Sequence, residues 1–173
     1  ARGDLGVEMP PEEVPIIQKR IVQKCRDFGK PVVVATQMLD SMINSPSPTR
    51  AEASDVASAV FDGADCLMLS AETAAGNFPV FSVEIMDRII RNVENDISYR
   101  QLLNSKPVKL EETTSDAISA AASQVVNIVA AKAIFTYTRS GKTAVRAARE
   151  RPSVPIIGLS PERITSRQLA LVW

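Results

Sequence analysis

The chain has 173 residues, of which 45% are hydrophobic and 23% charged, and its 20 Lys and Arg residues balance its 20 Asp and Glu residues. Zero net charge excludes a general attraction to nucleic acid or to an anionic membrane, so any anion site must be local. The absence of histidine excludes Ser-His-Asp catalysis, a histidine proton shuttle and His-ligated zinc. Carboxylate, hydroxyl, lysine, arginine and backbone chemistry remain, which suits Mg²⁺ and phosphate.

Residues 12–28 predict the first helix. Apolar side chains recur there at spacings of three and four, which puts them on one helix face: Val14, Ile17, Ile21, Cys25 and Phe28. Pro10 and Pro11 suit the beginning of this helix, and Gly29 is expected to end it. Residues 31–36, PVVVAT, then predict a short strand buried on both faces, as in a parallel sheet.

A second and a third unit follow the first. Thr49-Arg-Ala-Glu52 has the spacing of a capping box, and an apolar stripe continues from it through Ala53, Val56, Ala57, Val60 and Phe61. Residues 66–69 predict the next buried strand, and Pro79 opens a helix expected to turn Val83, Met86, Ile90, Val93 and Ile97 inward. Strands and helices that alternate every roughly 30 residues are typical of βαβ units on a parallel sheet. This region alone cannot close a barrel, because a barrel needs eight strands.

A polar stretch over residues 104–112 predicts a linker between a domain at 1–103 and a second domain at 113–173. In the second domain, Thr114 or Ser115 is expected to cap a helix that carries an apolar side formed by Ile118, Ala121, Ala122, Val125 and Val129. Strands at 133–137 and 155–159 alternate with helices at 141–150 and 164–169, which indicates another α/β domain. Both ends of the chain look cut, because it begins at Ala1 without a preceding strand and stops at Trp173 within an apolar run.

Polar residues gather where the first predicted strands end, and in parallel α/β proteins these ends hold the chemistry. Loops at 1–6, 36–38 and 70–73 offer two carboxylates, two hydroxyls and glycine N–H groups, from Asp4, Glu72, Thr36, Ser70 and Gly3. Mg²⁺-assisted phosphoryl transfer uses such groups, because Mg²⁺ takes one or two carboxylates together with substrate oxygens. The structural alternative is that Asp4 caps a helical turn, Thr36 bonds to backbone and Glu72 lies on the surface.

Several blocks resemble pyruvate kinase, in the order and at the intervals of that family. They are ARGDLGVE at 1–8, GKP at 29–31 with ATQML at 35–39, PTRAE at 48–52 with SDVA at 54–57, and DGAD at 62–65 with MLSAET at 68–73. The resemblance covers the chain from Ala1 to Trp173. It implies an α/β fold in which the last βα units of a TIM (β/α)8 barrel precede part of an α/β C-terminal domain. The activity that it implies is the glycolytic transfer of a phosphoryl group from phosphoenolpyruvate to ADP, giving pyruvate and ATP.

The resemblance implies a role for each residue at the strand ends. Asp4 would be one of two carboxylates that bind Mg²⁺ or Mn²⁺, and the N–H groups of Gly3 and Asp4 would hold the substrate carboxylate at the start of a short helix. Thr36 would be catalytic, donating a hydrogen bond to the substrate. Ser70 and Glu72 would belong to an active-site or nucleotide loop, although this chain has alanine where the family usually has glycine between them. Arg50 would reach a neighbouring subunit of a homo-oligomer, expected to be a tetramer.

In the family, the lysine that stabilises the phosphoryl group, the second metal carboxylate, the K⁺ ligands and the nucleotide-covering domain precede this region. Phosphoryl transfer depends on positioning and on charge neutralisation. This polypeptide by itself is therefore expected to be inactive.

Residues 138–143 predict an anion-binding loop between a strand and a helix, although their spacing is not that of a Walker loop. In regulated pyruvate kinases a similar segment holds the phosphate of an allosteric sugar-phosphate effector. The resemblance implies this role for Thr138, Arg139, Ser140, Gly141, Lys142 and Thr143. The alternative is that Ser140 only caps the helix while Arg139 and Lys142 are solvated.

Other interpretations stay open at this point. A barrel lyase that handles pyruvate enolates would also suit the Asp4 loop, and the chain could instead be a non-catalytic interaction fragment that exposes barrel edges. Arg2-Gly3-Asp4 spells the adhesive tripeptide of extracellular ligands, but no signal peptide opens the chain. The two cysteines are far apart within apolar patterns, so we expect reduced thiols and a cytoplasmic protein.

Overall fold

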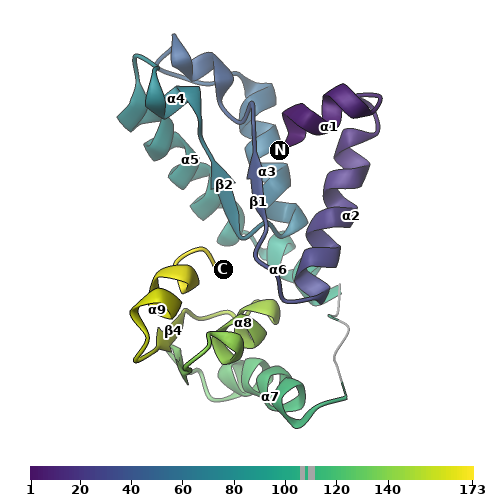
Figure 1. The fold of residues 1–173 in the computed structure, drawn as a ribbon, viewed down its shortest axis with the longest axis vertical. Coiled ribbons are helices and arrows are strands. Elements are labelled where there is room, and N and C mark those ends of the chain that lie inside the picture. The colour runs from purple at the N-terminus through teal and green to yellow at the C-terminus, as the bar shows by residue number, and fades with distance from the viewer. Residues whose placement is uncertain (106–107, 109–111) are drawn as a thin grey trace. The chain divides into compact units, whose positions relative to one another are not determined.

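The computed structural model describes residues 1–105, 108 and 112–173, apart from the side chain of residue 104. The chain divides into two compact units, one of Ala1–Lys24 with Val32–Lys106 and one of Cys25–Pro31 with Pro107–Trp173. Within the predicted linker at 104–112, residues 106, 107 and 109–111 lie outside the described residues. Each unit is an alternation of helices and parallel strands (Figure 1).

The first unit carries two parallel strands, β1 (Val33–Ala35) and β2 (Cys66–Met68), in the register Val33↔Cys66 to Ala35↔Met68. The helices along the chain are α1 (Arg2–Glu8), α2 (Val14–Asp27), the 3-10 helix η1 (Asp40–Ile43), α3 (Arg50–Asp62), α4 (Ala71–Ala74), α5 (Pro79–Glu94) and α6 (Ile97–Ser105). Helix α3 packs against α5 beside the strands (Figure 1). Both predicted strands of this unit are therefore present, each shorter at its ends than its apolar run suggested.

The core of the first unit lies between β1 and the helices that cover it. Its buried members come from α2, β1, the loop after β1, η1, α3 and α5: Val22, Val34, Met38, Leu39, Met42, Val56, Ala59 and Met86. Three of them, Met38, Leu39 and Met42, follow β1 directly and have no exposed surface. The segment leaving β1 is thus anchored by its own apolar side chains as well as by polar contacts.

The apolar face predicted for α2 is only partly covered. Val14, Ile17 and Cys25 are half-buried, but Ile21 is exposed and Phe28, beyond the end of the helix, is 71% exposed. The most buried positions are Val22 and two polar residues, Arg26 and Gln18, of which Gln18 donates to Asp62 of α3 (3.0 Å). Because two of these three residues are polar, apolar periodicity could not find this face.

The end of α5 also differs from the prediction. The helix stops at Glu94, and Ile97, expected to extend its inner face, opens the separate helix α6 and is exposed. Val83 is exposed too, whereas Met86 and Val93 are buried as predicted.

Helix α3 begins with the predicted capping box, which is confirmed. The Thr49 hydroxyl accepts from the Glu52 N–H (3.2 Å), and the Glu52 carboxylate accepts from the Thr49 N–H (2.7 Å). The same carboxylate accepts from the N–H (2.7 Å) and the hydroxyl (2.6 Å) of Ser41, so it joins η1 to α3. Burial opposes the ionisation of Glu52, but the hydrogen bonds from Ser41 and Thr49 outweigh burial and lower the pKa of this carboxyl group.

This lowered pKa predicts an acid-sensitive contribution to stability. A carboxyl group whose pKa is lower in the folded state stabilises the fold fully above its ordinary value, 4.5 for Glu52, and loses that contribution as the pH falls through the folded pKa. We expect Glu52→Gln to be less stable than the parent chain at about pH 7, and this difference to shrink below about pH 4.5. Urea unfolding followed by circular dichroism at several pH values measures the free energy of unfolding of the variant and of the parent chain. A stability difference between them that does not depend on pH would contradict the prediction.

The second unit has its own pair of parallel strands. Strands β3 (Ile134–Tyr137) and β4 (Ile156–Leu159) pair in the register Ile134↔Ile156 to Tyr137↔Leu159, and the helices are α7 (Thr114–Ile128), α8 (Lys142–Arg149) and α9 (Arg163–Leu169). Helix α7 packs against α8. All four predicted elements after the first helix are present within one or two residues of their expected bounds.

The prediction for α7 is wrong about the N-cap, and its apolar side is not the face that the helix buries. The N-cap is Thr113, whose hydroxyl accepts from the Asp116 N–H (3.2 Å), and not Thr114 or Ser115. The buried residues of the helix are Asp116, Ser119 and Val126, whereas Ile118, Val125 and Val129 of the apolar side are exposed. The helix turns a carboxylate inward because two arginines of α8 bind it there.

Candidate functional site

The polar residues predicted at the strand ends occupy one edge of the first unit. Strands β1 and β2 are parallel, so the loops that leave their C-terminal ends emerge on the same side of the sheet. Residues 36–38 leave β1, and residues 69 and 70 leave β2 and enter α4. The structure thus brings the second and third predicted loops to the same edge.

Helix α1 joins this edge through Gly3. A Cβ atom built on Gly3 would lie 3.1 Å from Cγ2 of Thr36, so the backbone of α1 touches the Thr36 side chain. Asp4 is the next residue of the helix, lies in its first turn and is exposed. The structure therefore brings together Gly3 and Thr36, which are 33 positions apart in the sequence.

The backbone after β1 has an unusual conformation. Thr36 and Gln37 have φ values of 80° and 53°, in the left-handed region that residues with a side chain rarely adopt. Such residues cost about 1–2 kcal/mol each and persist only where surrounding contacts hold them. They are often found at functional sites, and here they set the direction in which the half-buried Thr36 side chain leaves the strand.

Glu72 is a buried anchor, so the alternative in which it lies on the surface is wrong. The residue is only 3% exposed. Its carboxylate accepts hydrogen bonds from the backbone N–H groups of Leu39 (3.2 Å) and Ser70 (2.7 Å). These two bonds tie the segment after β1 to the loop after β2. Ala71 adopts helical backbone as the first residue of α4, a conformation that alanine favours, while Ser70 is exposed.

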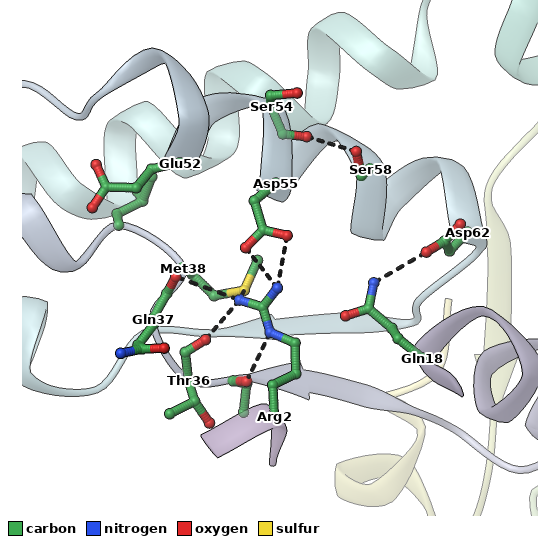
Figure 2. Close-up of polar contacts among 12 residues, drawn as sticks. Arg2, Gln18, Thr36, Gln37, Met38, Glu52, Ser54, Asp55, Ser58 and Asp62 are labelled. Atoms are coloured by element: carbon green, nitrogen blue, oxygen red, sulfur yellow. Dashed lines mark hydrogen bonds and ion pairs between the residues drawn. The ribbon is translucent and has the colours of Figure 1, made fainter. Parts of the chain in front are cut away.

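Sequence analysis missed a second anchor at this edge, Arg2 (Figure 2). Its guanidinium forms an ion pair with Asp55 of α3 (2.6 Å) and hydrogen bonds to the backbone that follows β1. Arg2 stands directly beside Gly3 in the sequence, but no local pattern links it to a partner 53 positions away. Because the Arg2 side chain is engaged and only 16% exposed, the geometry disfavours the adhesive-tripeptide interpretation.

The metal-ligating groups of the described residues are sparse. No group of three or more His, Cys, Asp or Glu side chains that could hold a metal ion occurs within 1–105, 108 and 112–173. Neither Cys25 nor Cys66 forms a disulfide bond.

The predicted phosphate loop connects β3 to α8. Gly141 is the N-cap of α8 with φ 80°, and no side chain caps this helix, so the alternative in which Ser140 is a simple cap is wrong. Thr138 is buried, and its N–H donates to the Leu159 carbonyl (2.9 Å). Ser140, Lys142 and Thr143 are exposed beside the first turn of the helix, while the largely exposed Arg139 lies 3.4 Å from Glu162.

Two further observations concern surfaces. Arg50 is the first residue of α3 and is exposed, so its side chain is accessible to a partner. Among the helices of the described residues, none is both long and apolar enough to cross a membrane.

Comparisons with known proteins place both parts of the chain. The family model "Pyruvate kinase, barrel domain" matches residues 1–83, and "Pyruvate kinase, alpha/beta domain" matches residues 116–173. Pyruvate kinases from Methylorubrum extorquens and Geobacillus stearothermophilus are 56% and 50% identical to the chain over all 173 residues. The chain spans 36% and 30% of the length of these two relatives.

A solved structure agrees with these matches. The crystal structure of a pyruvate kinase from Cryptosporidium parvum is 45% identical, with a TM-score of 0.93 over 99% of this chain and 35% of that one. The predicted fold, barrel βα units followed by an α/β domain, is therefore confirmed.

Proposed function

The chain belongs to the pyruvate kinase family, and on this premise we propose that it supplies part of a site that transfers a phosphoryl group from phosphoenolpyruvate to ADP. The products are pyruvate and ATP. The single observation that carries the proposal is the close approach of α1 to Thr36: a Cβ atom added to Gly3 would lie only 3.1 Å from Cγ2 of Thr36. That contact unites the two segments to which sequence reasoning assigned substrate binding.

Each residue at this edge has a chemical task in the proposal. The first turn of an α-helix leaves its N–H groups without intrahelical acceptors, so the N–H groups of Gly3 and Asp4 bind the substrate carboxylate. The Thr36 hydroxyl donates a further hydrogen bond to the substrate. Glu72 keeps the loops after β1 and β2 in register through its bonds to Leu39 and Ser70, which fixes the edge that the substrate meets.

Asp4 is the residue that we assign to a divalent cation, Mg²⁺ or Mn²⁺. Its carboxylate is exposed on α1, and an oxygen ligand of this kind suits a hard cation. The cation would supply charge neutralisation for the transferred group. We assign no described residue to K⁺.

The remaining parts of the proposal concern assembly and regulation. We assign residues 1–103 to the barrel, 113–173 to the α/β domain and 104–112 to the segment between them. Arg50 would contact another subunit of a homo-oligomer, a tetramer in our proposal.

Lys142, Thr143 and Ser140 beside the first turn of α8 would take the phosphate of a sugar-phosphate effector. We propose a cytoplasmic location, which the family's glycolytic role supports.

The test is a chimera in which these 173 residues replace the matching segment of the Methylorubrum extorquens pyruvate kinase. We expect the chimera to form pyruvate from phosphoenolpyruvate and ADP in a Mg²⁺-dependent reaction, and the 173-residue chain alone to show no such activity. The unaltered relative is the positive control. A folded chimera without this activity, or with retro-aldol cleavage instead, would refute the proposal and favour the lyase alternative.

A further inference from the structure

Arg2 lies where a cationic side chain could bind a substrate, but its side chain contacts only other parts of the protein. It precedes Gly3 and Asp4, and arginine is a common ligand of phosphate and carboxylate groups. Figure 2 shows its guanidinium instead turned toward Asp55 and the residues that follow β1. The contacts of this one side chain decide which role it has.

Every nitrogen of the Arg2 guanidinium is engaged by the protein itself. The group carries five N–H donors, and six acceptors lie within hydrogen-bonding distance. Nη1 donates to both carboxylate oxygens of Asp55 (2.7 and 2.6 Å). Nε donates to the carbonyl of Ala35, the last residue of β1 (3.3 Å). Nη2 donates to acceptors of the segment after β1: the carbonyls of Thr36 (2.6 Å) and Gln37 (3.4 Å), and Sδ of Met38 (2.9 Å).

These contacts fall on the strained residues. Thr36 and Gln37 both have positive φ, a conformation that is unfavourable for residues with a side chain. Hydrogen bonds from a charged donor are stronger than those between neutral groups. The bonds from Arg2 to the Thr36 and Gln37 carbonyls therefore act against the strain, provided that the guanidinium itself is held in place.

Asp55 holds the guanidinium in place. It belongs to α3, whose residues Val56 and Ala59 are part of the buried core, so the carboxylate is mounted on a fixed element. Its two short bonds to one nitrogen orient the plane of the guanidinium. The result is a connection from the core through Asp55 and Arg2 to the loop that carries Thr36.

We propose that Arg2, oriented by Asp55, is a positioning residue that holds the loop after β1 in its left-handed conformation and so sets Thr36 against α1 for the substrate carboxylate. Arg2 does not touch the substrate. This inference rests on the proposed function for its catalytic consequence, but the conformational part stands independently of it.

The conformational part is tested on the 173-residue chain by NMR. In Arg2→Lys the charge remains, but lysine cannot supply the planar fork of donors, so we expect the amide and Cα resonances of Thr36 and Gln37 to shift. Asp55→Asn, which leaves the carbonyl acceptors intact, should shift the same resonances. A folded Arg2→Lys variant with unchanged Thr36 and Gln37 resonances would overturn the inference. If Arg2→Lys does not fold, unchanged resonances of the same two residues in Asp55→Asn would overturn it.

The catalytic part is tested in the chimera. A misplacement of about 1 Å costs about 10²-fold in rate, so Arg2→Lys should lower kcat/KM for phosphoenolpyruvate by 10–100-fold, with a raised KM for phosphoenolpyruvate and an unchanged KM for ADP. A merely structural role would reduce the amount of active protein without changing either KM. The matched control is the Asp87–Arg91 pair of α5, joined at 2.7 Å but 53% and 72% exposed, whose Arg91→Lys variant should behave as the parent.

The NMR and kinetic experiments together distinguish a failure of the proposed function from a failure of the positioning role. An inactive but folded parent chimera refutes the proposed function, while the NMR shifts still decide whether Arg2 holds the loop. An active chimera in which Arg2→Lys leaves kcat/KM for phosphoenolpyruvate unchanged refutes the positioning role and leaves the proposed function intact.

Discussion

Replacing Asp116 by asparagine should lower the free energy of unfolding of the second unit by about 3–5 kcal/mol, because it removes one partner of a buried ionic cluster. Asp116 is 0% exposed. Its Oδ1 accepts from Nε of Arg146 (3.0 Å) and its Oδ2 from Nη2 of Arg149 (2.6 Å). Asparagine has nearly the same shape, so the variant tests charge rather than packing.

The size of this effect follows from the burial of the partner. The Arg149 side chain is only 5% exposed, so its charge cannot be rehydrated without opening the unit. Burial is also costly nearby, where it raises the pKa of Glu150 even though Arg149 and Arg26 favour the ionised carboxylate. A loss comparable to the whole stability of a small domain can result, since domains are stable by only about 5–15 kcal/mol.

The measurement can be confined to the second unit. Trp173 is the only tryptophan of the chain, and the guanidinium of Arg151 lies 5.0 Å from the centroid of its ring. Urea unfolding followed by tryptophan fluorescence therefore reports on this unit. Glu162→Gln, at the exposed Arg139–Glu162 pair of the second unit, is the control and should change stability by less than about 1 kcal/mol. Equal midpoints for Asp116→Asn and the parent chain would show that the cluster contributes nothing.

Asp4→Asn should lower the kcat/KM of the chimera for phosphoenolpyruvate by about 10³-fold. A metal ion contributes several kcal/mol of charge stabilisation in the transition state, and about 1.4 kcal/mol corresponds to a factor of ten in rate. Since Asp4 is one of the two carboxylates that the family resemblance assigns to the cation, the loss of its charge should weaken the site substantially. Steady-state kinetics over a titration of Mg²⁺ would show both a lower maximal rate and a higher Mg²⁺ requirement.

The control for Asp4 is another carboxylate of the same helix. Glu8 is exposed at the last position of α1, so Glu8→Gln changes the net charge equally without touching the first turn. We expect it to keep the parent kinetics. If Asp4→Asn retained the parent activity at all Mg²⁺ concentrations, the assignment of Asp4 to the cation would have to be abandoned.

The site illustrates which contacts can be predicted from sequence. Thr36 and Ser70 were predicted at one edge because parallel strands end on the same side of a sheet, and the structure places them so. The closeness of Gly3 to Thr36 followed from the family resemblance and is seen in the coordinates. Glu72 was assigned either to the surface or to an active-site loop, because spacing alone gives no sign that two backbone N–H groups bind its carboxylate.

The contacts that could not be predicted from the sequence share one property. Arg2 with Asp55, Glu52 with Ser41, and Asp116 with Arg149 are ionic or hydrogen-bonded contacts between residues far apart in the chain. A charged residue in a sequence is expected on the surface by default, so a buried ion pair leaves no periodic pattern. The same default explains the error on α7, where apolar periodicity favoured a face that the buried Asp116 does not share.

The sequence by itself determined the order of strands and helices, their parallel pairing, the capping box of α3 and membership of a family, because each depends on local spacing or on motifs in fixed order. The tertiary structure alone decided which face of each helix is buried and which charges are buried as pairs. Burial is a property of what lies opposite a side chain, and desolvated charges are tolerated only where a partner from a distant segment arrives. The loop after β1 is the clearest case: no residue within it explains its left-handed backbone, which depends on a guanidinium 34 positions away.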